Sequence, residues 1–273
     1  MIKKEKKTTN QDITKYIVFS NSEPDACNKL VEHEKSKKVF FDETHFIVIE
    51  SSVKIQKIGL TRLIKQLFFS GYTAPKSWKT EEFDFGSSLE IGVRVHRQLH
   101  HIFTCEKLQQ CDCKTKTHAS RLNKKTLAAK KFLQDYEIVC EQTEIPIVST
   151  AADCCTSLDM IGTKFKNTKN ARSVIISWKT GYCIDYDKNP SEEGLSHPFE
   201  KYQSTPQHHN QIQAILEYKI LREEYNIKFD DYYIVYLRHS KNEEYHVERL
   251  QDQELYIKEN SSIYKYFVQY RQK

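Results

Sequence analysis

The spacing of the hydrophobic residues changes from helix-like to strand-like near residue 136, and this change restricts the fold more than any other feature. Before it, apolar residues recur every three to four positions within 63–68 and 83–103, as on one face of a helix. After it come four short segments rich in β-branched residues: 136–140, 144–148, 157–161 and 173–178. A helix is expected over 208–225 and a strand over 232–237. This order predicts an α/β (α+β) fold with a central mixed β-sheet flanked by helices.

The two ends of the chain are predicted to extend a main domain at residues 59–240. The N-terminal extension, residues 1–58, has short strand signals at 39–41, 46–49 and 53–58. Thr61 is expected to cap the first helix of the main domain, and residues 181–206 are expected to form an irregular loop. The C-terminal extension, residues 241–273, is expected to be helical and to pack on the same domain.

Composition excludes several classes of protein. Hydrophobic residues make up 38% of the 273 positions, enough for a sizeable core, which argues against a disordered or collagen-like chain. No apolar stretch approaches the length of a membrane span, and the N-terminus lacks the apolar segment of a signal peptide. We therefore expect a soluble intracellular protein whose eight cysteines are reduced thiols or metal ligands rather than a disulfide framework.

The basic residues are concentrated in one segment. The formal net charge of +5 is too small to indicate a nucleic-acid partner by itself. Between Asp112 and Asp135, however, no acidic residue occurs, whereas seven lysines and arginines do. This segment, which includes Lys124 and Lys125, is either a solvated helix face or a surface that follows a phosphate backbone.

Asp159 and Lys179 form the pattern most relevant to chemistry. Asp159 lies on or just after one predicted strand and Lys179 ends the next, so a β-hairpin would bring the two side chains together. Hydrolysis of a phosphodiester needs carboxylates to hold Mg²⁺ and a lysine to orient the attacking water or to stabilise the developing charge. Considered alone, the two residues also fit an ordinary surface pair.

The segments around these two residues resemble a known family. Residues 158–161 (LDMI) followed by 174–180 (VIISWKT) are similar to the core hairpin of the PD-(D/E)XK nuclease superfamily, most of all its RecB- and lambda-exonuclease-like branch, which includes nucleases of large DNA viruses. Three further segments resemble motifs of that branch in the same order: 59–64, 86–96 and 211–214. The resemblance implies a restriction-endonuclease-like core and a Mg²⁺- or Mn²⁺-dependent DNA nuclease, in particular an exonuclease. Its partner would be duplex or single-stranded DNA, in the nucleus or cytoplasm, including that of a virus-infected cell.

The same resemblance implies roles for individual residues in catalysis. Asp159 would be the central metal ligand and Lys179 the catalytic lysine. His96 would contact the metal or a phosphate from its helix. An upstream acid often supplements the metal site, with Glu144 as the first choice and Glu141 as the alternative.

A second set of residues is implied to bind the substrate. Gln213, with Gln211 as the alternative, would contact the nucleic-acid backbone or order the site. The tyrosine expected one turn later stands at Tyr218, and Thr61 would hydrogen-bond a phosphate. Further candidates for contact with the substrate are Ser177, Lys124 and Lys125.

Ser177 departs from the family pattern, which has an acid two residues before the lysine. A serine hydroxyl is neutral and a poor Mg²⁺ ligand, so the site loses one negative charge. A carboxylate from a neighbouring element would compensate for this loss, and the conceivable sources are Glu217, Glu144 and Asp185. The alternative is a catalytically impaired protein with the nuclease fold that binds nucleic acid or a protein partner. An RNA-directed or cap-cleaving nuclease is a third reading.

Other residues near these motifs have simpler explanations. Gly92 would let its helix pack closely, and Trp178 would pack against the sheet. Cys154 and Cys155 are expected to be small buried hydrophobes. A structural Zn²⁺ site is an additional hypothesis for four residues with soft or imidazole ligands: Cys105, Cys111, Cys113 and His118.

Overall fold

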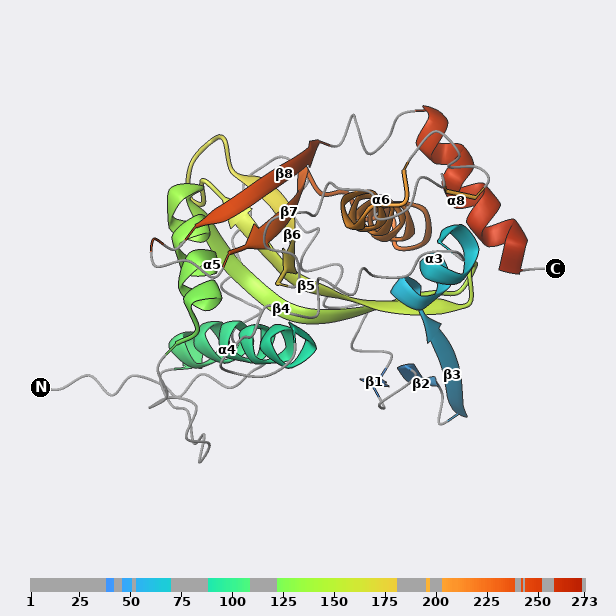
Figure 1. Cartoon of the computed structure of the whole chain (residues 1–273), viewed down its shortest axis with the longest axis horizontal. Helices are drawn as coiled ribbons and strands as arrows, with labels where there is room; N and C mark the ends of the chain where they lie inside the picture. The colour runs from blue at the N-terminus through green and yellow to red at the C-terminus, as the bar shows by residue number, and fades with distance from the viewer. Residues whose placement is uncertain are drawn as a thin grey trace, which may run out of the picture.

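The computed structural model describes residues 38–41, 46–50, 53–69, 88–108, 122–180, 195–196, 203–238, 242, 244–251 and 258–271. Over these residues the chain forms a central mixed β-sheet with helices on both faces, which confirms the expected α/β architecture (Figure 1). No helix within these ranges is long and apolar enough to cross a membrane.

The elements follow one another in an order close to that expected from the sequence. The strands are β1 (Lys38–Phe41), β2 (Phe46–Glu50), β3 (Val53–Gly59), β4 (Ile138–Ser149), β5 (Cys154–Lys164), β6 (Arg172–Lys179), β7 (Asp231–Leu237) and β8 (Tyr245–Gln251). The helices are α3 (Leu60–Phe68), α4 (Ser88–Leu108), α5 (Lys124–Asp135), α6 (Pro206–Glu224) and α8 (Lys258–Arg271).

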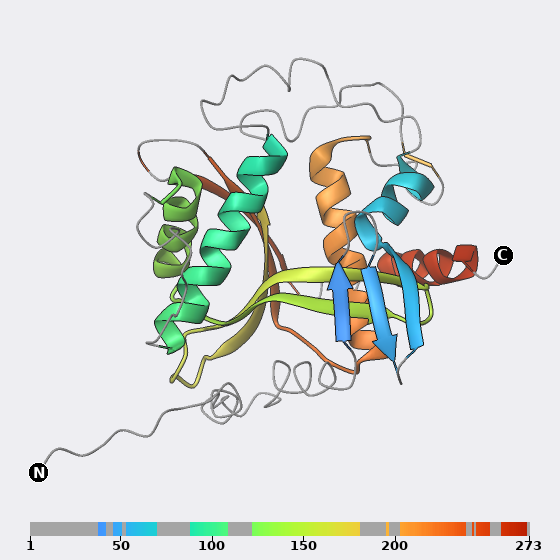
Figure 2. The same ribbon diagram turned by 90° about the horizontal axis from the view of Figure 1, so that it is seen from below.

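Two hydrophobic cores cover the two faces of the sheet. Helices α3, α6 and α8 pack on one face, around residues such as Tyr218 and Phe267, both with 0% exposure. Helices α4 and α5 pack on the other face, where the ring of Phe132 meets that of Trp178 edge to face. Figure 2 shows the two groups of helices on opposite sides of the strands. Trp178 is therefore packed against the sheet, as expected.

The sheet branches at β5, and this branch creates the space for the site described below. β4 pairs with one edge of β5 along nearly its whole length. The other edge is shared, because β3 pairs in parallel at Cys154 and Cys155, whereas β6 pairs antiparallel only from Met160 to Lys164. Among the described strands, none pairs with residues 156–159 on that second edge, so side chains from α6 can approach β5 there.

β4 is one long strand, although the sequence predicts two separate segments in this region. Its pairing with β5 shifts register between Cys140 and Gln142, so the strand contains a bulge. Glu144, a few residues later, has a φ of 53°, in the left-handed region. The bulge and the unusual backbone interrupt the two-residue alternation of side chains, which explains why the sequence pattern looks like two short strands.

Two helices begin earlier than expected, which corrects the role given to Thr61. α3 begins at Leu60, with the extended Gly59 as its N-cap and no capping side chain, so Thr61 is not the cap. Leu60 is 1% exposed, and burying it draws the helix start forward. α6 begins at Pro206 within the expected loop, because Thr205 accepts a hydrogen bond from the backbone N–H of His208 and proline suits the first helical position.

The elements of the N-terminal extension (residues 1–58) agree with the sequence prediction, and those of the C-terminal extension (residues 241–273) agree with it in part. The three expected N-terminal strands are present as β1, β2 and β3. The C-terminal extension, expected to be helical, contains helix α8 but also strand β8, which pairs antiparallel with β7. Helix α4 continues to Leu108, five residues beyond the helix-like pattern of residues 83–103.

Candidate metal centre

Three side chains from three different elements converge beside the branch in the sheet. His96 from α4, Glu144 from β4 and Asp159 from β5 each offer a ligand atom, and these atoms lie within 4.8 Å of one another. The Nδ1 atom of His96 is 3.0 Å from Oε1 of Glu144 and 3.6 Å from Oδ1 of Asp159. The sequence prediction named all three residues, and the fold brings them together from positions up to 63 residues apart.

The electrostatics of this cluster favour a positive charge at its centre. Burial by itself would lower the pKa of His96, but the negative charges of Asp159 and Glu144, with the hydrogen bond to Glu144, outweigh it and raise the pKa to about 9. An imidazolium therefore lies between the two carboxylates. The two carboxylates are the oxygen ligands that Mg²⁺ and Mn²⁺ prefer, whereas an imidazole nitrogen suits softer first-row divalent ions. The donor set thus fits a divalent cation, with the two carboxylates as the ligands that suit Mg²⁺ or Mn²⁺.

Close packing of α4 brings His96 to the cluster. A Cβ atom at Gly92 would lie 2.9 Å from Oγ1 of Thr180, so any larger residue would push the helix away from the end of β6. His96 follows Gly92 by one helical turn and faces the same side. This confirms the close-packing role expected for Gly92.

Asp159 is held in place by the neighbouring strand β6. Its Oδ2 atom accepts hydrogen bonds from the backbone N–H of Trp178 at 2.7 Å and from Oγ of Ser177 at 3.1 Å. The other oxygen, Oδ1, faces His96. Ser177 therefore contacts the central carboxylate as a donor, whereas the acid expected from the family pattern would repel it.

Lys179 belongs to a hydrogen-bonded network that connects β6 with α6. Its Nζ atom lies 3.4 Å from Oε1 of Gln213, whose Nε2 atom donates to Glu217 at 2.8 Å. Glu217 also accepts hydrogen bonds from Thr156 on β5, at 2.9 Å, and from the hydroxyl of Tyr232 on β7. The network orients Lys179 toward the branch in the sheet that also holds Asp159.

Glu217 is buried close to Asp159 but is not one of the three clustered side chains. Its side chain is 1% exposed, and burial raises the pKa of its carboxyl group. The negative charge of Asp159 acts in the same direction, whereas the hydrogen bonds from Tyr232 and Gln213 and the charge of Lys179 act against it. Glu217 thus lies close enough to interact with both Asp159 and Lys179, but it is not one of the three clustered ligands.

His209 is a site residue that the sequence analysis missed. Its ring packs on Phe69, the residue that follows α3, with 5.0 Å between ring centroids, and it lies near Lys179. Burial and the charges of Lys179 and Lys65 lower its pKa to about 4, so the imidazole is neutral. The signal was present in the sequence, because residues 209, 213 and 217 recur every four positions on one face of α6.

The structure distinguishes between the alternatives left open by the sequence. Glu144, and not Glu141, belongs to the cluster, because Glu141 forms an ion pair with Lys166 at 2.9 Å. Gln213, and not Gln211, approaches Lys179, because Gln211 donates to Glu248 of β8 at 3.0 Å.

Four further residues named in the sequence analysis lie in different environments. Lys125 is 1% exposed, and its ammonium group donates to the backbone carbonyl of Thr180, so this lysine fastens α5 to the end of β6 and is not a surface contact for a phosphate. The hydroxyl of Tyr218 donates to the carbonyl of Phe229, away from the cluster. Thr61 is exposed on α3 near His209, and Lys124 is half-buried at the start of α5.

The cysteine predictions have two different outcomes. Cys154 and Cys155 are buried on β5 and form no disulfide among the described residues, as expected for small hydrophobes. The proposed zinc ligands lie outside the described residues, apart from the backbone of Cys105 in α4, and Asp185 also lies outside them.

Two comparisons with known proteins found no match. No protein-family model matches the chain, and no curated protein matches it.

Proposed function

We propose that this chain has a restriction-endonuclease-like core and hydrolyses phosphodiester bonds of DNA with a divalent metal ion, Mg²⁺ or Mn²⁺. The observation that most supports the proposal is the convergence of His96, Glu144 and Asp159 beside Lys179. These residues were selected from sequence motifs, and each comes from a different element. The resemblance of those motifs to the RecB- and lambda-exonuclease-like branch favours an exonuclease within this class.

The three clustered side chains would hold the metal ion. Asp159 presents Oδ1 to the centre because its Oδ2 is engaged by Ser177 and Trp178. Glu144 and His96 would supply an oxygen and a nitrogen. When bound, the ion would activate water and neutralise charge that develops on the phosphate.

Lys179 would act on the reacting water or phosphate. Its ammonium group can donate three hydrogen bonds, and the contact with Gln213 uses one of them. The remaining protons can orient an attacking water or stabilise a non-bridging phosphate oxygen. Gln213 and Glu217 are positioning residues in this scheme, because they act through Lys179.

Cleavage of end-labelled DNA tests the proposal. Purified protein is incubated with duplex and with single-stranded DNA in Mg²⁺ or Mn²⁺, and the products are resolved on a denaturing gel. We expect cleavage in at least one metal, and we expect Asp159→Ala and Lys179→Ala each to reduce the rate by a factor of at least about 100. Lys169→Ala, which removes an exposed lysine in the turn after β5, serves as the charge-matched control. A folded protein that cleaves neither substrate in either metal would refute the proposal.

A second candidate function is binding of nucleic acid without catalysis. It is favoured by Ser177, which replaces an acid with a neutral donor and leaves the cluster with two carboxylates. The variant Ser177→Asp distinguishes the two functions. If it creates cleavage or raises the rate at least about tenfold, the natural site is impaired; if the natural protein already cleaves and the variant does not exceed it, the three-residue cluster is sufficient.

A further inference from the structure

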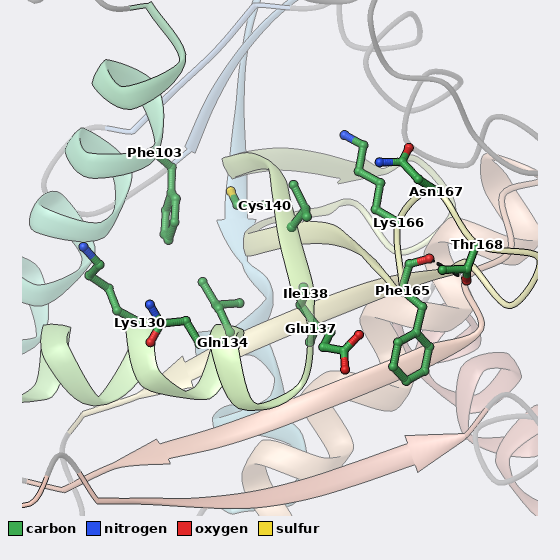
Figure 3. Close-up of a pocket in the computed structure, with 12 residues that line it drawn as sticks. Phe103, Lys130, Gln134, Glu137, Ile138, Cys140, Phe165, Lys166, Asn167 and Thr168 are labelled. Atoms are coloured by element: carbon green, nitrogen blue, oxygen red, sulfur yellow. Dashed lines mark hydrogen bonds between the residues drawn. The ribbon is translucent and has the colours of Figure 1, made fainter.

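A pocket of about 720 Å³ lies beside the C-terminal half of α4, away from the metal cluster (Figure 3). Its walls come from α4, α5, the first residues of β4 and the turn between β5 and β6. This volume is in the range of pockets that bind small organic groups.

The pocket combines an apolar wall with a polar rim. Phe103 from α4 and Val139 from β4 face it, and Val139 is 42% exposed, which is unusual for a large aliphatic residue on a strand. The ammonium groups of Lys130 and Lys166 stand on the α5 side and on the turn side, and the amide of Asn167 lies next to Lys166 (Figure 3). The carboxylate of Glu137 also lines the pocket, near Ile138 (Figure 3). The apolar wall suits an aromatic face, and the two ammonium groups suit an anionic group held on their side of the pocket.

The backbone around the pocket is held in an unfavourable conformation. Glu137, Phe165 and Asn167 line the pocket and have φ values of 53°, 53° and 70°. A bulky residue such as Phe165 rarely adopts this region, at a cost of about 1 kcal/mol or more. Lys166, between two of these residues, is fixed by its ion pair with the buried carboxylate of Glu141. The rim is therefore preorganised.

A continuous row of contacts connects the pocket with the metal cluster. Along α4, His96 meets Glu144, and His100 meets Thr143 with 2.6 Å between Nδ1 and Oγ1. Phe103 continues this helical face and lies seven residues after His96, about 10 Å along the axis. A strand that leaves the cluster along α4 and β4 would pass His100 and reach the pocket.

We propose that this pocket holds a nucleotide of the strand whose phosphodiester lies at the metal cluster, with its base against Phe103 and Val139 and its phosphate near Lys130 and Lys166. The assignment to a strand rests on the proposed function. The fit of the pocket to a base and a phosphate does not depend on the proposed function, because a free nucleotide would present the same groups.

Binding without metal tests the pocket separately from catalysis. Fluorescence anisotropy measures the Kd of a labelled oligothymidylate in EDTA. Val139→Glu, which places a negative charge in the wall that would hold the base of an anionic strand, should raise the Kd at least about tenfold, because like charges repel across an interface. Lys130→Ala should raise it about threefold or more. Two controls should stay within about threefold of the natural protein, after circular dichroism verifies folding: Val139→Gln, which has the shape of the glutamate without its charge, and Lys169→Ala, outside the pocket.

The outcomes separate the two proposals and the two ligand sources. Equal Kd values for Val139→Glu, Lys130→Ala and the natural protein would overturn the pocket assignment, whether or not DNA is cleaved. Loss of binding in these variants, in a protein that cleaves nothing, would support the pocket and refute the nuclease. A free-nucleotide site would give a different combination of results. Thymidine 5′-monophosphate would shift the melting temperature of the natural protein, Val139→Glu would abolish that shift, and the variant would bind the oligonucleotide as tightly as the natural protein does. That combination would show that the strand assignment is wrong.

Discussion

Ser177 and Asp159 show how a single replacement is accommodated at the site. Two donors on β6 bind the same oxygen of Asp159, so the other oxygen is directed to the cluster. A second carboxylate at position 177 would remove one of these donors and add repulsion unless a cation lay between the two groups. The serine therefore stabilises the arrangement of the site in the absence of a cation.

The neutral His209 gives the protein a pH-dependent stability at the residue scale. Its pKa is about 4 in the folded state, and 6.5 is the ordinary value for histidine. Between these values the unfolded chain binds a proton that the folded chain does not, so the free energy of unfolding decreases as the pH falls from 6.5 to 4. The groups that oppose protonation are Lys179 on β6 and Lys65 on α3.

Urea unfolding at several pH values between 7 and 4 measures this effect through the variant His209→Gln. We expect the natural protein to lose on the order of 2 kcal/mol more than the variant over this range. The difference between the two proteins removes the contribution of carboxyl groups that titrate in both. Parallel pH profiles would show that His209 is protonated normally in the folded state.

At the scale of elements, the contact between α4 and the end of β6 sets the position of His96. Gly92→Ala introduces a Cβ atom 2.9 Å from Oγ1 of Thr180. Overpacking of this kind costs about 1–3 kcal/mol, partly offset by the gain of about 1 kcal/mol in helix propensity. We expect Gly92→Ala to destabilise the natural protein, as measured by thermal or urea unfolding.

The double variant tests whether that contact is responsible. In a Thr180→Ala background the opposing hydroxyl is absent, so Gly92→Ala should become stabilising by about 1 kcal/mol. The change of sign is the diagnostic result. A similar destabilisation in both backgrounds would mean that the helix is fixed by other contacts.

At the scale of the whole molecule, one sheet separates two hydrophobic cores that share its strands. Phe132 belongs to the core under α4 and α5, and Phe267 to the core under α6 and α8; both are fully buried. The same strands contribute side chains to both cores: on β6, Ile176 belongs to the core under α4 and α5, and Ile175 to the core under α6 and α8. We therefore expect the two cores to unfold together.

Conservative core variants test this cooperativity. Phe132→Leu and Phe267→Leu should each reduce the free energy of unfolding by about 1 kcal/mol or more, and the double variant should lose the sum within about 0.5 kcal/mol. All three should unfold in one transition when followed by both tryptophan fluorescence and circular dichroism. Two separate transitions would show that the cores are independent units.

The order of the elements and the hairpin that carries Asp159 and Lys179 could be predicted from the sequence by itself. Helix and strand periodicity is local, so it marks α3, α5, β6 and β7 without knowledge of their partners. The hairpin of β5 and β6 follows from two adjacent strand signals. Helix starts were less well predicted, because burial of Leu60 and capping by Thr205 decide them.

Only the tertiary structure decided which side chains share the site. Glu141 and Glu144 look alike in the sequence, but the bulge in β4 and the left-handed backbone at Glu144 direct them to different partners. Gln211 and Gln213 are separated by about 200° around α6, so the packing of that helix on the sheet selects one of them. Burial of Lys125 likewise depends on the docking of α5 against β6. A residue's type and spacing are local properties, whereas the face it presents depends on register and packing.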